Sequence, residues 1–119
     1  MLVHNYEKLT VWQKSMDLVE LVYIMTKSFP KEEIYGITSQ MKRCAISVPS
    51  NIAEGSRRRS QKDFRNFLLI SMGSASELET QLKIAKRLKF GILTEYSAVE
   101  SLLIEVLKML NKLIQTIKV

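Results

Sequence analysis

The 119-residue chain has little of the material that builds sheets, disulfide frameworks or metal sites. Its single cysteine, Cys44, cannot form a disulfide within the chain, which fits a reducing compartment. Its single histidine, His4, lies in an expected N-terminal arm, where solvent exposure is the simplest role. Four glycines and two prolines offer little turn chemistry for a protein made of strands. No basic-then-apolar leader opens the chain and no apolar run is long enough to span a bilayer, so we expect a cytoplasmic protein with no membrane partner.

Catalytic and cofactor motifs are also missing. The sequence contains no HExxH, CxxC, GxSxG or Walker-type spacing, and its four glycines are scattered and form no phosphate-binding loop. Lys42 and Arg43 could lower the pKa of the Cys44 thiol, although a small buried helix residue is the preferred role for Cys44. The sequence therefore predicts a protein without catalytic residues, metal or cofactor.

Positive charge is what the chain does have, and it is unevenly spread. The net charge is +6, and the span from residue 42 to residue 89 alone carries +7. A basic region of this kind favours a polyanionic partner over a neutral one, although a solvated helix surface is the plainer alternative. We expect the basic residues of this span to contact phosphates: Lys42, Arg43, Arg57, Arg58, Arg59, Lys62, Arg65, Lys83, Lys86, Arg87 and Lys89.

Apolar residues recur every three or four positions along the chain, which predicts four long helices. The first should begin near Thr10, where the Thr10–Gln13 tetrapeptide matches a capping box, and end before Phe29-Pro30. The others should cover roughly residues 36–55, residues 61–89 after a Ser60 cap, and the segment after Gly91, which Thr94 could cap. Together they predict a single all-α domain, 1–119, folded as an antiparallel up-down-up-down four-helix bundle with a possible arm at 1–9.

The second expected helix contains an internal proline. Pro49 removes a backbone donor, so the helix must bend or restart there, and the side chain of Asn51 can satisfy backbone groups that a bend frees. Gly55 is expected to end the helix in a left-handed conformation, and Glu54 to pair with a nearby arginine. The buried face should include Ile46, Asn51 and Ala53.

Two of the expected helices have apolar faces that are wider than a single buried stripe. The fourth helix is nearly continuously apolar from Leu103 to Leu107, and the first is so from Leu21 to Met25. Such wide faces favour self-association. Trp12 and Tyr35 are interpreted as packing residues in preference to platforms for stacking bases.

One pattern of residues extends over nearly the whole chain: Tyr6, Leu9, the segments 11–14, 29–30 and 33–36, the block 40–55 with its SVPSNIAEG string, and Phe64, 67–68, 73–74 and 77–82. In this pattern the chain resembles the bacterial four-helix bundle proteins of the ribosomal-RNA intervening-sequence family. The resemblance implies a ring-like homopentamer. A relative of similar fold, the accessory variability protein of diversity-generating retroelements, presents a basic surface to nucleic acid and partners a reverse transcriptase. The resemblance implies no catalytic site.

Two functional hypotheses follow. The leading one is a non-enzymatic, oligomeric nucleic-acid-binding protein that prefers RNA and reads little sequence, because no RNA-recognition aromatic motif is present. Arg58, Lys62 and Arg65 would share one helical face if the third helix extended back to Arg58. The alternative is a protein–protein adaptor or structural assembly module whose charges keep it in solution.

Overall fold

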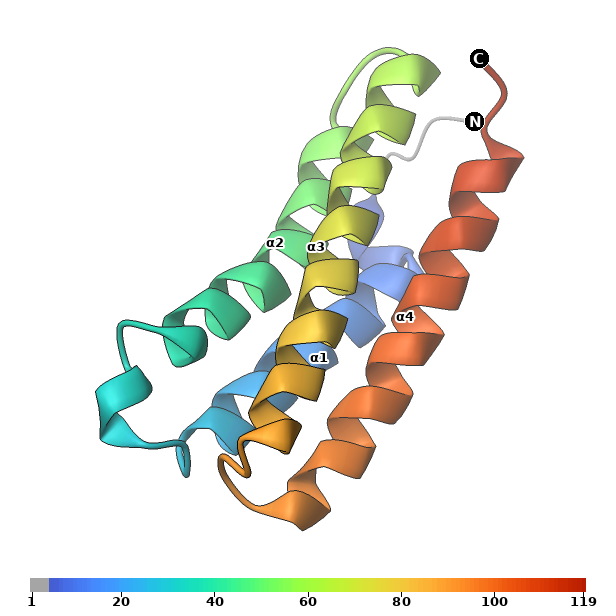
Figure 1. The fold of residues 1–119 in the computed structure, drawn as a ribbon. Coiled ribbons are helices and arrows are strands. Elements are labelled where there is room, and N and C mark those ends of the chain that lie inside the picture. The colour runs from blue at the N-terminus through green and yellow to red at the C-terminus, as the bar shows by residue number, and fades with distance from the viewer. Residues whose placement is uncertain (1–4) are drawn as a thin grey trace.

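The computed structural model describes residues 5–119, and this part of the chain contains four long helices and no strand. Figure 1 shows successive helices joined at alternate ends in an elongated bundle of 43 × 24 × 20 Å. The all-α four-helix class predicted from the sequence is confirmed, whereas the prediction for His4 falls outside the described residues. The helices are α1 (Thr10–Thr26), α2 (Ile37–Ser56), α3 (Gln61–Arg87) and α4 (Tyr96–Thr116). Short 3-10 turns precede three of them, at Tyr6–Lys8, Lys31–Glu33 and Leu93–Glu95.

The start of α1 differs from the predicted capping box. Leu9 is the N-cap and no side chain caps the helix, because Thr10 is already its first residue. The side chain of Gln13 instead donates from Nε2 to the carbonyl of Glu7 at 2.9 Å, which ties α1 to the turn before it. The capping-box prediction is therefore wrong, although the predicted starting residue is right.

Of the two side-chain caps predicted for the later helices, one is present and one is absent. Ser60 caps α3, because its Oγ accepts from the backbone N–H of Asp63 at 3.1 Å, as predicted. Thr94 does not cap α4: it lies within the preceding 3-10 turn, and the N-cap position belongs to Glu95 without a side-chain hydrogen bond.

Helix α2 continues through its proline and its glycine. It runs unbroken from Ile37 to Ser56 with Pro49 buried inside it, so the helix does not restart there. Gly55 also lies inside the helix, and the predicted left-handed helix end is wrong. The glycine is required for space, because a Cβ at position 55 would lie 2.6 Å from the Cβ of Phe67 on α3.

The core is one apolar cluster to which all four helices contribute. On α2 the buried face differs from the predicted one, since Ile46 is 42% exposed and Asn51 and Ala53 are only half-buried. The α2 residues that face the core are instead Met41, Ala45, Val48 and Ile52. Core residues from the four helices include Leu18, Val22, Met25, Met41, Ala45, Val48, Ile52, Phe64, Leu68, Leu78, Leu82, Val99, Leu103, Val106 and Leu110.

The two aromatic residues singled out in the sequence have different environments. Trp12 is half-buried, packs against the core and meets the Tyr6 ring edge-on with 5.3 Å between ring centroids. Tyr35, in the connection between α1 and α2, is 96% exposed, so the prediction that it packs in the core is wrong. Among residues 5–119, no helix combines the length and apolar character needed to cross a bilayer.

Candidate nucleic-acid interface

The structure does not gather the predicted phosphate-contacting residues into one patch. Helix α3 is unbroken between the two ends of the bundle, and at ~1.5 Å per residue it places Lys62 and Arg87 about 37 Å apart. We call the residues at its start the turn cluster and those at its end the far cluster. The turn cluster is Arg57, Arg58, Arg59, Lys62 and Arg65; the far cluster is Lys83, Lys86, Arg87 and Lys89; Lys42 and Arg43 lie on α2.

The turn cluster surrounds the short connection between α2 and α3 (Figure 1). Arg57 is the C-cap of α2, and its guanidinium lies 5.5 Å from the centre of the Tyr6 ring. Arg59 and Lys62 are exposed and Arg65 is half-buried. Within residues 5–119, none of these four basic side chains forms an ion pair. Their charge is available to a ligand.

Arg58 differs from its neighbours because its charge is partly neutralised. Its Nη2 lies 3.1 Å from Oε2 of Glu54, which confirms the predicted pairing of Glu54 with an arginine. Its guanidinium also lies 4.8 Å from the centre of the Phe67 ring. Because α3 begins at Gln61, Arg58 lies in the turn and does not share a helical face with the basic residues of α3. The condition for that prediction is not met.

The far cluster occupies the last turn of α3 and the segment that follows it. Lys86 and Arg87 lie in the last turn, where positive charge interacts favourably with the helix dipole. Lys86 is engaged, because its Nζ lies 3.2 Å from Oε2 of Glu100 on α4. Lys89 has a φ of 60°, a conformation that non-glycine residues seldom adopt, and it turns the chain away from α3. Lys83, Arg87 and Lys89 remain as exposed cations without an ion pair among the described residues.

Lys42 and Arg43 are adjacent in sequence but have different environments. Lys42 is half-buried, and its Nζ lies 4.7 Å from the centre of the Tyr23 ring on α1. Arg43 is exposed and lines a groove between α2 and α3. Consecutive helix residues are about 100° apart around the axis, so the two side chains leave α2 in different directions.

Aromatic side chains beneath four of these cations were missed from the sequence. Tyr6, Tyr23, Phe67 and Tyr96 each hold a cationic group within the distance of a cation–π contact. These aromatic residues are 9 to 51 positions away from their cationic partners, so no local sequence pattern could have paired them. Such contacts restrict the side chains, and those of Lys42 and Arg57 do so without an ion pair among the described residues.

The SVPSNIAEG string forms the contact between α2 and α3. Ser47 Oγ lies 2.8 Å from Ser74 Oγ, and Asn51 Nδ2 donates to the carbonyl of Ser47 at 2.8 Å. Ser71 Oγ on α3 donates to the carbonyl of Val48 at 2.8 Å, beside the interior proline. The Ser47 side chain and the Val48 carbonyl therefore join the string to α3, while Gly55 lets the two helices approach. Its role is structural in this arrangement.

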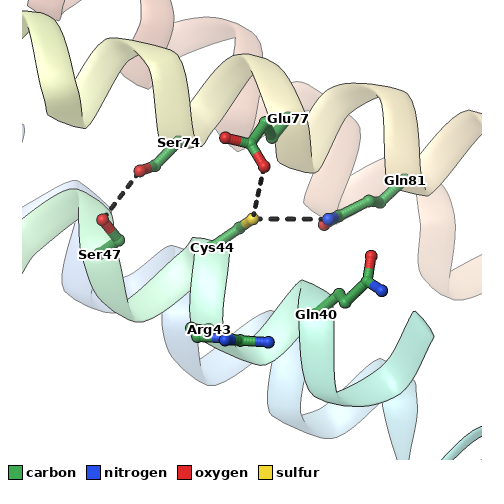
Figure 2. A pocket seen from close by; sticks show the side chains of 7 residues that line it. All are labelled: Gln40, Arg43, Cys44, Ser47, Ser74, Glu77 and Gln81. Carbon is green, nitrogen blue, oxygen red and sulfur yellow. Dashed lines mark hydrogen bonds between the residues drawn. The ribbon is translucent and has the colours of Figure 1, made fainter. Parts of the chain in front are cut away.

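Figure 2 shows the groove of about 390 Å³ that continues this contact. The thiol of Cys44 donates to Oε2 of Glu77 at 3.7 Å and accepts from Nε2 of Gln81 at 3.5 Å. Burial is the main cause that raises the pKa of the Cys44 thiol, and the charge of Glu77 raises it further. The thiol therefore stays protonated near neutral pH, which is the opposite of the activation that Lys42 and Arg43 could have produced. The groove is lined by Gln40, Arg43, Cys44, Ser47, Ser74, Glu77 and Gln81.

The groove lacks the features of a ligand or metal site. The Oε1 atom of Gln81 has no hydrogen-bond partner, but it is buried out of reach of solvent. Among residues 5–119, no three histidine, cysteine, aspartate or glutamate side chains are grouped so that they could hold a metal ion. The exposed basic clusters at the two ends of α3 thus remain the candidate interface.

Comparison with known proteins places the chain in one family. A crystal structure of a protein of unknown function from the S23 ribosomal protein family of Bacteroides thetaiotaomicron is similar, with a TM-score of 0.78 and 25% sequence identity over 88% of this chain and 95% of that one. A search of curated proteins found no match. The sequence model of the 23S rRNA-intervening sequence proteins matches residues 7–112. The chain therefore belongs to the 23S rRNA-intervening sequence protein family.

Proposed function

We propose that this protein is a non-enzymatic, oligomeric nucleic-acid-binding protein that prefers RNA, reads little sequence and acts in the cytoplasm. The observation that carries the proposal is the turn cluster, in which Arg57, Arg59, Lys62 and Arg65 present cationic groups without an ion pair in the described part of the chain. Phosphates bound by such groups release counterions, which supplies affinity independent of base sequence.

The preference for RNA is supported by the family, whose name refers to sequences within 23S ribosomal RNA. Binding without catalysis is supported by the protonated thiol of Cys44, which is unsuited to nucleophilic attack. At the turn cluster, Tyr6 and Phe67 lie beneath the guanidinium groups of Arg57 and Arg58, which favours phosphate contacts over base stacking.

The test is fluorescence anisotropy of nuclease-treated protein with a labelled structured RNA, titrated at several salt concentrations. The logarithm of the binding constant should fall linearly with the logarithm of the salt concentration, with a slope that reports the number of phosphate contacts. Arg59→Gln should lower the affinity for every RNA and reduce that slope by about 1. The absence of binding at low salt would exclude the proposal.

Arg58→Gln is the matched control. It removes the same charge one residue away, but from a side chain that is already paired with Glu54 at 3.1 Å. We expect it to weaken binding less than Arg59→Gln does. An equal or larger loss from Arg58→Gln would show that the ion pair opens on binding and that the assignment of free cations is wrong.

A protein–protein adaptor is the second candidate, and one observation favours it. Ile34 and Tyr35 protrude from the connection between α1 and α2 with 52% and 96% of their surface exposed. Exposed aromatic and aliphatic residues are typical anchors of protein interfaces. Pull-down after nuclease treatment separates the two functions, because an adaptor would retain its partner through Tyr35 without nucleic acid, and Tyr35→Ala would release it.

A further inference from the structure

Helix α3 carries a continuous exposed strip on the side away from its buried stripe. Eight residues at steps of three or four share this side, because such steps return to the same face of a helix. All are exposed except Arg65, which is half-buried. We call them the α3 strip: Lys62, Arg65, Leu69, Gly73, Ser76, Thr80, Lys83 and Arg87.

The charges of the α3 strip are confined to its two ends. Each end has two basic residues and no position of the strip is acidic. None of the four basic residues has an ion-pair partner within residues 5–119, in contrast to Arg58 and Lys86 beside the strip. A polyanion lying along α3 would therefore meet unneutralised cations at both ends.

The side chains in the middle of the strip, at Gly73, Ser76 and Thr80, are short. At Gly73 a Cβ would meet no atom within 4 Å, and Ser76 and Thr80 are short and exposed. A rigid partner can thus approach close to the helix between the long basic side chains. The two hydroxyl groups can hydrogen-bond to phosphate or sugar oxygens there, which are the usual positioning contacts of nucleic-acid-binding proteins.

The spacing of the two ends matches a double helix. Along α3, Arg65 and Lys83 lie about 27 Å apart, and Lys62 and Arg87 lie about 37 Å apart. One turn of an A-form RNA duplex is shorter than the ~34–36 Å turn of B-form DNA and falls between these two distances. Each strand of a duplex lying parallel to α3 would return to the strip after about one turn, whereas a flexible single strand has no fixed repeat. Double-stranded RNA is recognised by shape and by phosphate and 2′-hydroxyl contacts across a wide, shallow minor groove.

We propose that the α3 strip binds double-stranded RNA lengthwise. Lys62 and Arg65 contact phosphates at one end, Lys83 and Arg87 contact phosphates about one turn away, and Ser76 and Thr80 contact the backbone between them. This inference rests on the proposed function and narrows it to a base-paired ligand of a minimum length.

The experiment measures the fluorescence anisotropy of three labelled RNAs: blunt duplexes of about 8 and about 18 base pairs, and a single strand of the longer length. The longer duplex exceeds the ~16 base pairs that a double-stranded-RNA-binding domain spans. We expect the longer duplex to bind about tenfold more tightly, because only it reaches both ends of the strip. It should also show the steeper salt dependence. Equal affinity for the two duplexes, or for the duplex and the single strand, would overturn the inference.

Charge variants locate the contacts. Two double variants each remove the charge at one end of the strip: Lys62→Gln with Arg65→Gln, and Lys83→Gln with Arg87→Gln. Each double variant should bind the long duplex only as tightly as the unaltered protein binds the short one. Lys108→Gln with Lys112→Gln is the control, because it removes the same charge from exposed positions of α4.

A charge added in the middle tests the close approach. Ser76→Glu places an acidic group at the centre of the strip and should weaken binding of the long duplex about tenfold, whereas Ser101→Glu on the exposed side of α4 should not. Circular dichroism establishes that each variant is folded. If RNA binds but neither end pair matters more than the α4 control, the lengthwise arrangement is wrong and the proposed function stands. If no RNA binds at low salt, both are wrong.

Discussion

At the scale of single residues, the two glycines of the α2–α3 pair have opposite roles. Gly55 lies where a methyl group would be 2.6 Å from Phe67 Cβ and 3.1 Å from Phe64 Cδ1. Gly73 lies on the outer side of α3, where a methyl group would meet nothing within 4 Å. Gly55 must be glycine because the neighbouring helix leaves no space for a side chain, whereas the space beside Gly73 is open within the monomer.

Gly55→Ala should therefore destabilise the protein although alanine favours helices. Overpacking of this kind typically costs about 1–3 kcal/mol, and the gain in helix propensity of about 1 kcal/mol offsets only part of it. Because the 2.6 Å contact is with the Phe67 Cβ, which cannot turn aside, we place the overpacking cost in the upper part of that range. The free energy of unfolding should then fall by about 1–2 kcal/mol in urea titrations followed by circular dichroism. The control Gly73→Ala should raise it by up to about 1 kcal/mol. A neutral Gly55→Ala variant would mean that α2 and α3 separate easily.

At the scale of elements, α3 depends on the one side-chain cap that the sequence predicted correctly. Ser60→Ala removes the hydrogen bond from Asp63 N to Ser60 Oγ and should lower the free energy of unfolding by about 1 kcal/mol. Ser101→Ala, at an exposed position inside α4, is the control and should change stability little. Both are measured by urea titration, and an equal effect of the two would show that the cap contributes nothing.

The sequence predicted the helices well because their signal is local. Apolar spacing and the Ser60 cap are properties of neighbouring residues, so they located α3 with an error of two residues at its end. Gly55 was misassigned because its reason lies on another helix: the local pattern of a helix-ending glycine is the same as that of a glycine required by Phe67. Tyr35 was misassigned because a 3-10 turn interrupts the apolar pattern before α2 and leaves it outside the bundle.

The candidate interface was predicted only as a set of residue types. The sequence identified the basic residues, but their pairing and distribution depend on tertiary structure. The partial neutralisation of Arg58 by Glu54 joins residues only four apart in the sequence, and a pairing of Glu54 with an arginine was foreseen. The engagement of Lys86 by Glu100 joins two helices and had no local signal. The separation of the two clusters follows from the length of α3, which was predicted as one helix over residues 61–89.

At the scale of the whole molecule, apolar side chains remain on the outside of the monomer. Ile24 on α1 is 52% exposed and Ile104 on α4 is 46% exposed, both within the wide apolar faces noted in the sequence. We infer that the protein self-associates, and the resemblance to the intervening-sequence family makes a pentamer the expected assembly. Its melting temperature should then rise with protein concentration, because association stabilises only the folded chain.

Light scattering measures the molecular mass of the assembly and so tests self-association directly. Ile24→Asp should reduce the mass of the assembly while leaving the helical content unchanged, since the side chain is not part of the monomer core. Glu20→Gln, an exposed α1 position one turn away, is the control and should leave the mass unchanged. A monomeric mass for the unaltered protein, with a melting temperature independent of concentration, would contradict self-association.

The polar contact between α2 and α3 also has a consequence for the order of folding. These two helices are consecutive and are joined by only the four residues 57–60, so their contact closes a short loop. The contact between α1 and α4, which includes the ion pair of Lys14 with Glu105 at 2.6 Å, must close a loop of most of the chain. Loop closure costs more entropy as the loop lengthens, and local contacts form faster. The hairpin of α2 and α3 can therefore assemble as the chain is synthesised, before the last helix exists to complete the bundle.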